Sequence, residues 1–117
     1  MRLYLAGPMT GLPDKNFPMF HKVAAQLRRK RHTVWSPAEA DLSIGFDPVM
    51  NFDNKQMGYF MKYELPIVCS SDAVAVLPGW EKSLGANLEV HVARICNIPV
   101  VDALTLKPVK KLNRWGI

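Results

Sequence analysis

The sequence predicts an α/β fold in which a parallel sheet is covered by helices on both faces. Short apolar runs alternate along the chain with segments of helical periodicity, which is the pattern of strands joined by crossover helices. Residues 73–77 form a continuous apolar run, as in a strand that is buried on both faces. The 117 residues, 49% hydrophobic and 21% charged, are enough for one domain with its own core.

The first part of the chain predicts a strand, a loop, a helix and a second strand. Residues 3–6 read as a buried strand, and residues 7–14 as a glycine-rich loop at its carboxyl end, where open α/β sheets bind ligands. A helix follows, with Asn16 as a candidate N-cap. Its apolar residues have helical spacing: Phe17, Phe20, Val23, Ala24 and Leu27. Residues 33–35 predict the second strand, and residues 36–54 are expected to be an irregular loop, either mobile or functional.

The second part predicts two further helices, each followed by a strand. One helix is expected over residues 55–70, with Glu64 inside its apolar face and Pro66 on the opposite side, where it would kink or restart the helix. The strand at residues 73–77 leads through a loop to a helix for which Ser83 is a plausible N-cap. Residues 98–101 predict the last strand. We expect residues 103–117 to be a basic tail, with room for a short strand.

The most unusual residue of this pattern is Glu89. Each helical residue turns by about 100°, so Asn87, His91 and Arg94 share a narrow polar arc while Glu89 falls in the middle of the apolar arc. A carboxylate held away from water costs several kcal/mol unless it is paired or neutralised. Glu64 repeats the pattern on a different helix. The two residues are therefore candidates for a functional pair, the alternative being buried partners of arginines.

Two inward carboxylates on neighbouring elements match the arrangement that cleaves glycosidic bonds. One carboxylate attacks or stabilises the anomeric carbon, and the other acid helps the leaving group to depart. The helix start at Ser83 adds an anion site, because unpaired N–H groups and the helix dipole favour negative charge there. Gly85 would let an anion approach the backbone, and Trp80 could stack on a planar base. The alternatives are that Ser83 only caps the helix, and that Trp80 and Tyr4 only pack.

The net charge of +5 does not by itself indicate a nucleic-acid partner. Residues 28–31 hold much of the positive charge at a predicted helix end, where cations complement the helix dipole. The rest lies largely in the tail, at Lys107, Lys110, Lys111 and Arg114. Since no nucleic-acid motif accompanies them, we do not expect nucleic-acid binding.

The cysteines and the hydropathy pattern predict a soluble cytoplasmic protein without a metal or other cofactor. Cys69 and Cys96 lie on apolar helical patterns without ligand spacing, so we expect reduced thiols in the core. No apolar run approaches the roughly 18 residues of a membrane span, and the N-terminal apolar stretch is too short for a signal peptide.

Three segments in fixed order carry a family resemblance: Leu3-Tyr4-Leu5-Ala6-Gly7-Pro8, Tyr63-Glu64-Leu65 with Asp72 eight residues after Glu64, and Ser83-x-Gly85-Ala86-x-x-Glu89. From residue 3 to about residue 101 the chain resembles the nucleoside 2-deoxyribosyltransferase superfamily. The resemblance implies a flavodoxin-like or Rossmann-like three-layer sandwich over residues 1–102, with a central parallel sheet of about four to five strands.

The resemblance also implies roles for individual residues. Glu89 would be the nucleophile that attacks C1′ of a 2′-deoxyribosyl group, Tyr4 would orient it, and Glu64 would assist protonation of the departing base. The substrate would be bound by the remaining matched positions and their neighbours: Gly7, Pro8, Trp80, Ser83, Gly85 and Ala86. A homodimer or larger assembly is implied as well, with sites near subunit contacts to which the tail could contribute.

Two departures from the superfamily pattern narrow the expected function. Many members carry Asp where this chain has Glu64, and transferases carry an Asp shortly before the nucleophile where this chain has Ser83. A Ser there resembles the deoxynucleoside 5′-monophosphate N-glycosidase branch, so we expect hydrolysis of deoxynucleoside monophosphates. The alternatives are base exchange by a transferase, cleavage of NAD, and a non-catalytic nucleotide-binding or sensor domain.

Overall fold

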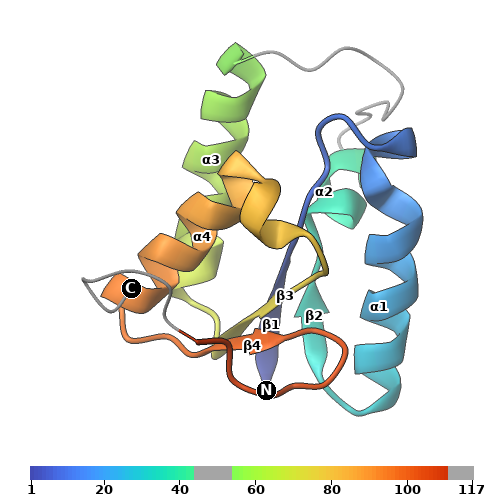
Figure 1. Ribbon diagram of the computed structural model, residues 1–117, viewed down its shortest axis with the longest axis vertical. Helices are drawn as coiled ribbons and strands as arrows, with labels where there is room; N and C mark the ends of the chain where they lie inside the picture. The colour runs from blue at the N-terminus through green and yellow to red at the C-terminus, as the bar shows by residue number, and fades with distance from the viewer. Residues whose placement is uncertain (44–53, 111–117) are drawn as a thin grey trace.

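Four parallel strands form the central sheet of the computed structural model, which describes residues 1–43 and 54–110 (Figure 1). Their order is β2-β1-β3-β4. The strands are β1 (Arg2–Ala6), β2 (Thr33–Trp35), β3 (Ala73–Val76) and β4 (Val100–Asp102). The chain moves outward from β1 to β2 and then crosses to β3 on the other side of β1, so the switch point of the topology lies between the carboxyl ends of β1 and β3.

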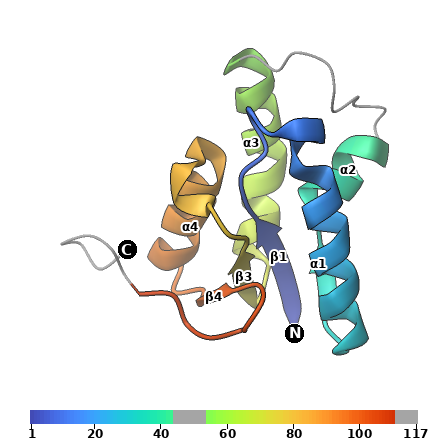
Figure 2. The same ribbon diagram turned by 45° about the vertical axis from the view of Figure 1, so that its right-hand side comes forward.

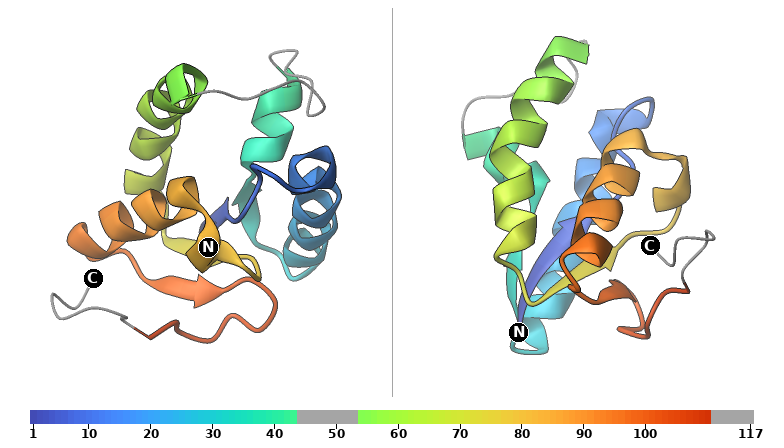
Figure 3. Two further views of the ribbon diagram at one scale, coloured as in Figure 1. Left: turned by 45° about the horizontal axis from the view of Figure 1, so that its top comes forward. Right: turned by 90° about the vertical axis from the view of Figure 1, so that its left-hand side faces the viewer.

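The helices lie in two layers, one on each face of the sheet (Figures 2 and 3). The α-helices are α1 (Phe17–Arg29), α2 (Pro37–Ser43), α3 (Asn54–Cys69) and α4 (Leu84–Ile95), and two 3₁₀ turns are η1 (Pro13–Asn16) and η2 (Trp80–Lys82). α1 and α2 cover one face, while α3 and α4 cover the other. The predicted α/β sandwich with a parallel sheet is therefore confirmed. No helix in the described residues is long and apolar enough to cross a membrane.

The alternation of side chains along β1 divides the core into two clusters. Leu3 and Leu5 point toward α1 and α2, where they pack with the apolar face of α1. Tyr4 and Ala6 point the other way, into the cluster formed with α3 and α4. Because Tyr4 lies on a central strand, its ring is fully buried on the side of the sheet that carries α3 and α4.

Helix α4 turns Glu89 inward, as its helical phase predicts. Glu89 is 4% exposed and lies among the other buried residues of the helix, which are Gly85, Ala86, Val90 and Ala93. The rest of the predicted apolar arc is not covered, since Leu84, Leu88 and Ile95 are exposed on the outer face. The apolar arc is thus wider than the part of the helix that the sheet and α3 bury.

The expectation of an irregular loop over residues 36–54 is wrong for its first part, which is helical. Pro37–Ser43 form α2, in which Pro37 occupies the first turn, where its missing N–H costs nothing. Arg28 of α1 holds Glu39 of α2 by two hydrogen bonds of 2.6 Å each and also donates to the carbonyl oxygen of Val34. Residues 44–53 of the predicted loop lie outside the described residues.

Three local expectations also need correction. Helix α3 continues through Pro66 up to Cys69, with the proline ring exposed, so of the two expected effects of Pro66 the restart does not occur. Asn16 precedes α1 but makes no side-chain capping bond, because it has a left-handed φ of 61° at the end of η1. Cys69 and Cys96 are not core thiols, since both are exposed at the ends of α3 and α4.

The described part of the predicted tail, residues 103–110, folds back onto the sheet. The N–H of Val109 donates to the carbonyl oxygen of Val100 at 2.9 Å, and Val101 and Pro108 form an antiparallel bridge. Arg94 of α4 donates to the carbonyl oxygens of Val109 and Lys110. This segment therefore packs against β4 and α4, while residues 111–117 lie outside the described residues.

Replacing Gly7 by Ala is expected to destabilise the protein by about 1–3 kcal/mol, because a Cβ there would lie 2.8 Å from the Cβ of Leu77. The crowding would push the end of β1 away from β3, and the midpoint of urea unfolding measures the loss. Gly58→Ala is the matched control: a Cβ at this exposed position in α3 meets nothing within 4 Å. That change should be neutral or stabilising, and equal losses in both variants would contradict the steric explanation.

Candidate active site

Tyr4, Glu64 and Glu89 meet between the sheet and the helices α3 and α4. The Tyr4 hydroxyl is hydrogen-bonded to Oε2 of Glu89 and lies 3.3 Å from Oε2 of Glu64. The three side chains are 0%, 6% and 4% exposed, in the order Tyr4, Glu64 and Glu89. Each comes from a different element, so the fold brings together the three residues that the sequence singled out as catalytic.

Burial and mutual charge keep this cluster partly protonated. Burial, and next the charge of Glu64, raise the pKa of Glu89 well above its usual range, and the hydrogen bond from Tyr4 opposes this only in part. Glu89 and Glu64 are also hydrogen-bonded to each other, which requires a proton on one of the two carboxyl groups. Burial and the two neighbouring carboxyl groups raise the pKa of Tyr4 as well, so its hydroxyl keeps its proton and acts as a donor.

The cluster therefore combines a carboxylate, a carboxylic acid and a neutral phenol in a site that excludes water. A carboxyl pair with one shared proton can supply a nucleophile and a general acid at the same pH. The phenol has a single proton to donate, and it can hold the attacking carboxylate in a fixed orientation. These are the parts needed to break a bond at an electrophilic carbon and to protonate the leaving group.

Trp35 supports the cluster, although the sequence analysis assigned it only to a strand. Its ring stacks on the ring of Tyr4, with the centroids 5.0 Å apart and the planes 14° from parallel. Trp35 is half-buried at the carboxyl end of β2, directly opposite Tyr4 in the parallel register. The one signal in the sequence was its place at the end of a strand, because the pairing of that strand with β1 cannot be read from residues 33–35 alone.

The loops after β1 and β3 lie side by side at the switch point of the sheet. Gly7 packs against Leu77, and a Cβ on Gly79 would lie 3.6 Å from the ring of Pro8. Trp80 follows in η2, but its ring is 6% exposed and belongs to the buried cluster that also holds Tyr4. Gly7 and Pro8 thus lie at the edge where such sheets bind ligands, while Trp80 forms part of the wall beneath that edge.

The start of α4 is built as an N-terminal cap. The Oγ atom of Ser83 accepts a hydrogen bond from the N–H of Ala86 at 3.2 Å. The side-chain amide of Asn87 donates to the carbonyl oxygens of Ser83 at 2.7 Å and Glu81 at 2.9 Å, which fastens the preceding turn to the helix. Gly85 and Ala86 are buried in the first turn. The capping interpretation of Ser83 is therefore confirmed, and its hydroxyl proton is not donated to any group in the described part of the chain.

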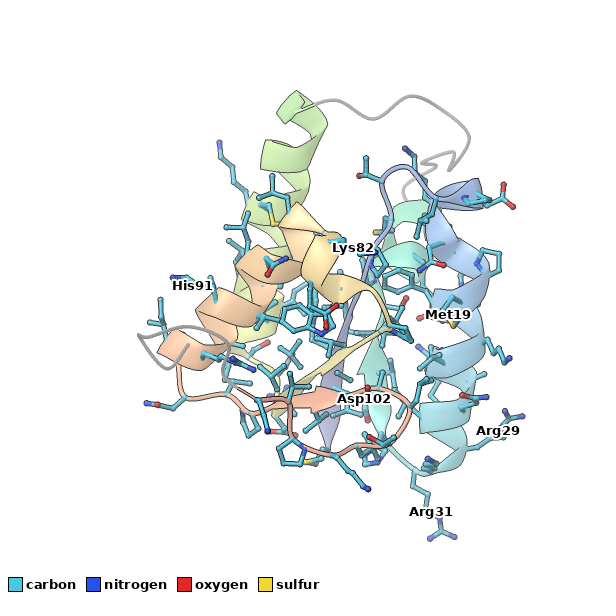
Figure 4. All side chains as sticks on the ribbon, viewed as in Figure 1. Met19, Arg29, Arg31, Lys82, His91 and Asp102 are labelled. Carbon is cyan, nitrogen blue, oxygen red and sulfur yellow. The ribbon has the colours of Figure 1, made fainter. Side chains whose placement is uncertain are left out.

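Positive side chains project from two distant parts of the molecule. Lys82, at the end of η2, projects near the start of α4, whereas Arg29, the last residue of α1, and Arg31, in the turn after it, project at the far end of that helix (Figure 4). Within residues 1–43 and 54–110, no three His, Cys, Asp or Glu side chains come together in a way that could hold a metal ion.

The fold and the buried acid cluster define a flavodoxin-like α/β protein with a candidate site at the face covered by α3 and α4. The chain belongs to the family described as a domain of unknown function, DUF4406, which matches residues 1–102. No curated protein matches the chain. Among solved structures, it is similar to a 2-deoxyribosyltransferase from the psychrotolerant bacterium Bacillus psychrosaccharolyticus, with a TM-score of 0.63 and 23% sequence identity over 86% of this chain and 70% of that chain. At this level of identity the likeness shows a shared fold.

Proposed function

We propose that the protein is an N-glycosidase that hydrolyses deoxynucleoside 5′-monophosphates to the free base and deoxyribose 5-phosphate. The observation that carries the proposal is the buried cluster in which Tyr4 contacts Glu89 and Glu64, where burial and the charge of Glu64 raise the pKa of Glu89. Cleavage of an N-glycosidic bond needs a carboxylate on one side of the anomeric carbon and a proton for the departing nitrogen.

In the proposed reaction, Glu89 forms a covalent intermediate with the sugar. Its carboxylate attacks C1′ as the bond from C1′ to the base nitrogen breaks, and the electron pair of that bond stays on the base. The proton that the two carboxyl groups share moves to Glu64 as Glu89 attacks, and Glu64 passes it to the base. Water then attacks C1′, returns a proton to Glu64 and releases Glu89 as a carboxylate. The Tyr4 hydroxyl holds the attacking oxygen in place throughout.

The start of α4 supports a phosphorylated substrate. The N–H groups of Leu84 and Gly85 lie in the first helical turn, where no intrahelical acceptor is available, and the hydroxyl proton of Ser83 can be donated to a phosphate oxygen. Lys82 adds a positive charge beside them (Figure 4). Ser83 precedes Glu89 by about 9 Å along the helix axis, so one helix would hold the phosphate at its start and present the nucleophile further along.

Replacing Ser83 by Ala is expected to raise KM for a deoxynucleoside monophosphate about 10-fold, since one hydrogen bond to a charged group is lost. The KM for the unphosphorylated deoxynucleoside should stay the same, and initial rates over a range of both substrates measure the difference. Loss of the cap will also lower stability by about 1 kcal/mol. Ser83→Thr is the matched control, because it keeps both the cap and the hydroxyl. A similar change in KM for both substrates would count against a phosphate contact at this position.

The aromatic partner of the base would be Trp35. Its ring is half-buried beside Tyr4, whereas Trp80 has its ring in the core. A base that stacked on the exposed part of Trp35 would bring its glycosidic bond to the carboxyl end of β1, next to the catalytic cluster.

The same cluster would serve a transferase if a second base replaced water, and the shared fold with a 2-deoxyribosyltransferase favours keeping this candidate. The test is to incubate the protein with deoxynucleosides, their 5′-monophosphates and NAD, with and without an added acceptor base, and to follow free base and deoxyribose 5-phosphate. We expect both products from the monophosphates without an acceptor. Base exchange without deoxyribose 5-phosphate would establish the transferase, and no base release from any substrate would overturn both proposals.

A further inference from the structure

Two thiols come together at the end of the molecule that lies away from the loops of the candidate site. Cys69 is the last residue of α3, and Cys96 is the C-cap of α4. Both helices lead into or out of parallel strands on the same face of the sheet, so their carboxyl ends lie at the same edge. The two helices pack against each other, and Val68 and Ala93, which precede the cysteines by one and three residues, belong to the same buried cluster.

The two cysteines are neighbours at the carboxyl ends of these packed helices, and both are open to solvent. Cys96 lies close enough to Cys69 to raise the pKa of the Cys69 thiol, and both residues are exposed. An exposed pair of this kind differs from the buried single thiols that act as small apolar residues, because a dissolved reagent can reach either sulfur and the second sulfur lies within reach of the first.

We propose that Cys69 and Cys96 are a dithiol that forms an intramolecular disulfide by exchange with a low-molecular-weight disulfide such as oxidised glutathione. One cysteine thiolate attacks a sulfur of glutathione disulfide, forms a mixed disulfide and expels one glutathione thiolate. The other cysteine thiolate attacks the protein sulfur of the mixed disulfide and expels the second glutathione. The two protein thiols are oxidised by two electrons, the small disulfide is reduced to two thiols, and the protein loses two protons.

The disulfide would join the two helices that carry the acid pair. Glu64 precedes Cys69 by five residues on α3, and Glu89 precedes Cys96 by seven residues on α4. Partial burial, and next the bond and charge of Cys96, raise the pKa of the Cys69 thiol. The attacking species is the thiolate, so disulfide formation should become faster as the pH rises. The proposed disulfide does not depend on the proposed glycosidase reaction.

The test is a titration of the full-length protein with mixtures of reduced and oxidised glutathione at pH 8, followed by acid quenching, alkylation and intact mass measurement. We expect a monomer that has lost two hydrogen atoms and takes up no alkylating reagent, with a peptide map that joins Cys69 to Cys96. Chains that carry two glutathiones, or disulfide-linked dimers in place of the internally linked monomer, would overturn the proposal.

The single variants Cys69→Ser and Cys96→Ser show whether each thiol is reachable. Each variant should gain one glutathione, which shows that its remaining thiol is accessible, and neither should lose two hydrogen atoms. If both variants gain glutathione but the wild type forms no internal disulfide, the two thiols are accessible but cannot form a bond with each other. The oxidised wild type should unfold at a temperature about 5–15 °C higher than the reduced protein, because the bond closes a loop in the unfolded chain. A lower unfolding temperature would mean that the bond forms only by distorting the helices, and would contradict the proposed fit of the disulfide to the fold.

Discussion

Glu89→Gln is expected to lower kcat for base release at least about 10³-fold, the largest effect of any change in the cluster. Gln has nearly the shape of Glu and can still accept the hydrogen bond from Tyr4, but its amide oxygen is a poor nucleophile toward C1′. The variant should therefore bind the substrate and fail to release base. Single-turnover measurements with a deoxynucleoside monophosphate would follow free base, and mass measurement would look for the sugar adduct on the wild type.

The control for this prediction is Glu81→Gln, which removes an exposed carboxylate from η2 without touching the cluster. It should keep the wild-type rate. Glu64→Gln should fall between the two, at about 10²-fold below the wild type, since general acid catalysis is the smaller contribution. If Glu89→Gln and the wild type release base at the same rate, Glu89 is not the nucleophile. If Glu64→Gln is the more damaging change, the two roles must be exchanged.

The inward position of Glu89 could be predicted from the sequence because it depends on local geometry. A helix fixes the direction of each side chain relative to its neighbours, so a carboxylate on an apolar arc is visible without any tertiary information. The same geometry did not show how much of the arc would be covered. Leu84, Leu88 and Ile95 share its apolar character and are exposed, since only the positions near Ala86 and Ala93 face the sheet.

The features that the sequence analysis missed depend on contacts between distant segments. Trp35 stacks on Tyr4 only because β2 pairs with β1 in a particular register, and a strand of three residues does not specify its partner. The proximity of Cys69 to Cys96 likewise follows from the packing of α3 on α4. Helix α2 was missed although Ala38, Glu39 and Ala40 are good helix formers, because seven residues are too few to show a helical period and the attachment of Glu39 comes from Arg28 on another helix.

Glu89→Gln is also expected to stabilise the folded protein at neutral and higher pH, at the site where it removes activity. Burial and the charge of Glu64 raise the pKa of Glu89 in the folded state above its usual value of 4.5, so the folded protein binds more protons than the unfolded chain as the pH rises above that value. The stability of the wild type should therefore fall from about pH 4.5 up to the raised pKa and stay low above it. In Glu89→Gln, the side chain at position 89 does not titrate, and Glu64 faces a neutral amide.

The expected gain is about 1–4 kcal/mol at pH 8, since each unit by which folding raises the pKa of a carboxyl group costs about 1.4 kcal/mol above that pKa, and close to zero below pH 4.5. Urea unfolding at a series of pH values measures it, with Glu81→Gln as the control that should follow the wild-type curve. Tyr4 on β1 and Glu64 on α3 are the titratable groups hydrogen-bonded to Glu89, and both remain in the variant. A variant that is less stable than the wild type at pH 8 would show that the Glu89 carboxylate is well solvated or paired in the folded state. That result would contradict a raised pKa of Glu89. It would also contradict the shared proton on which the roles of Glu64 as acid and Glu89 as nucleophile depend.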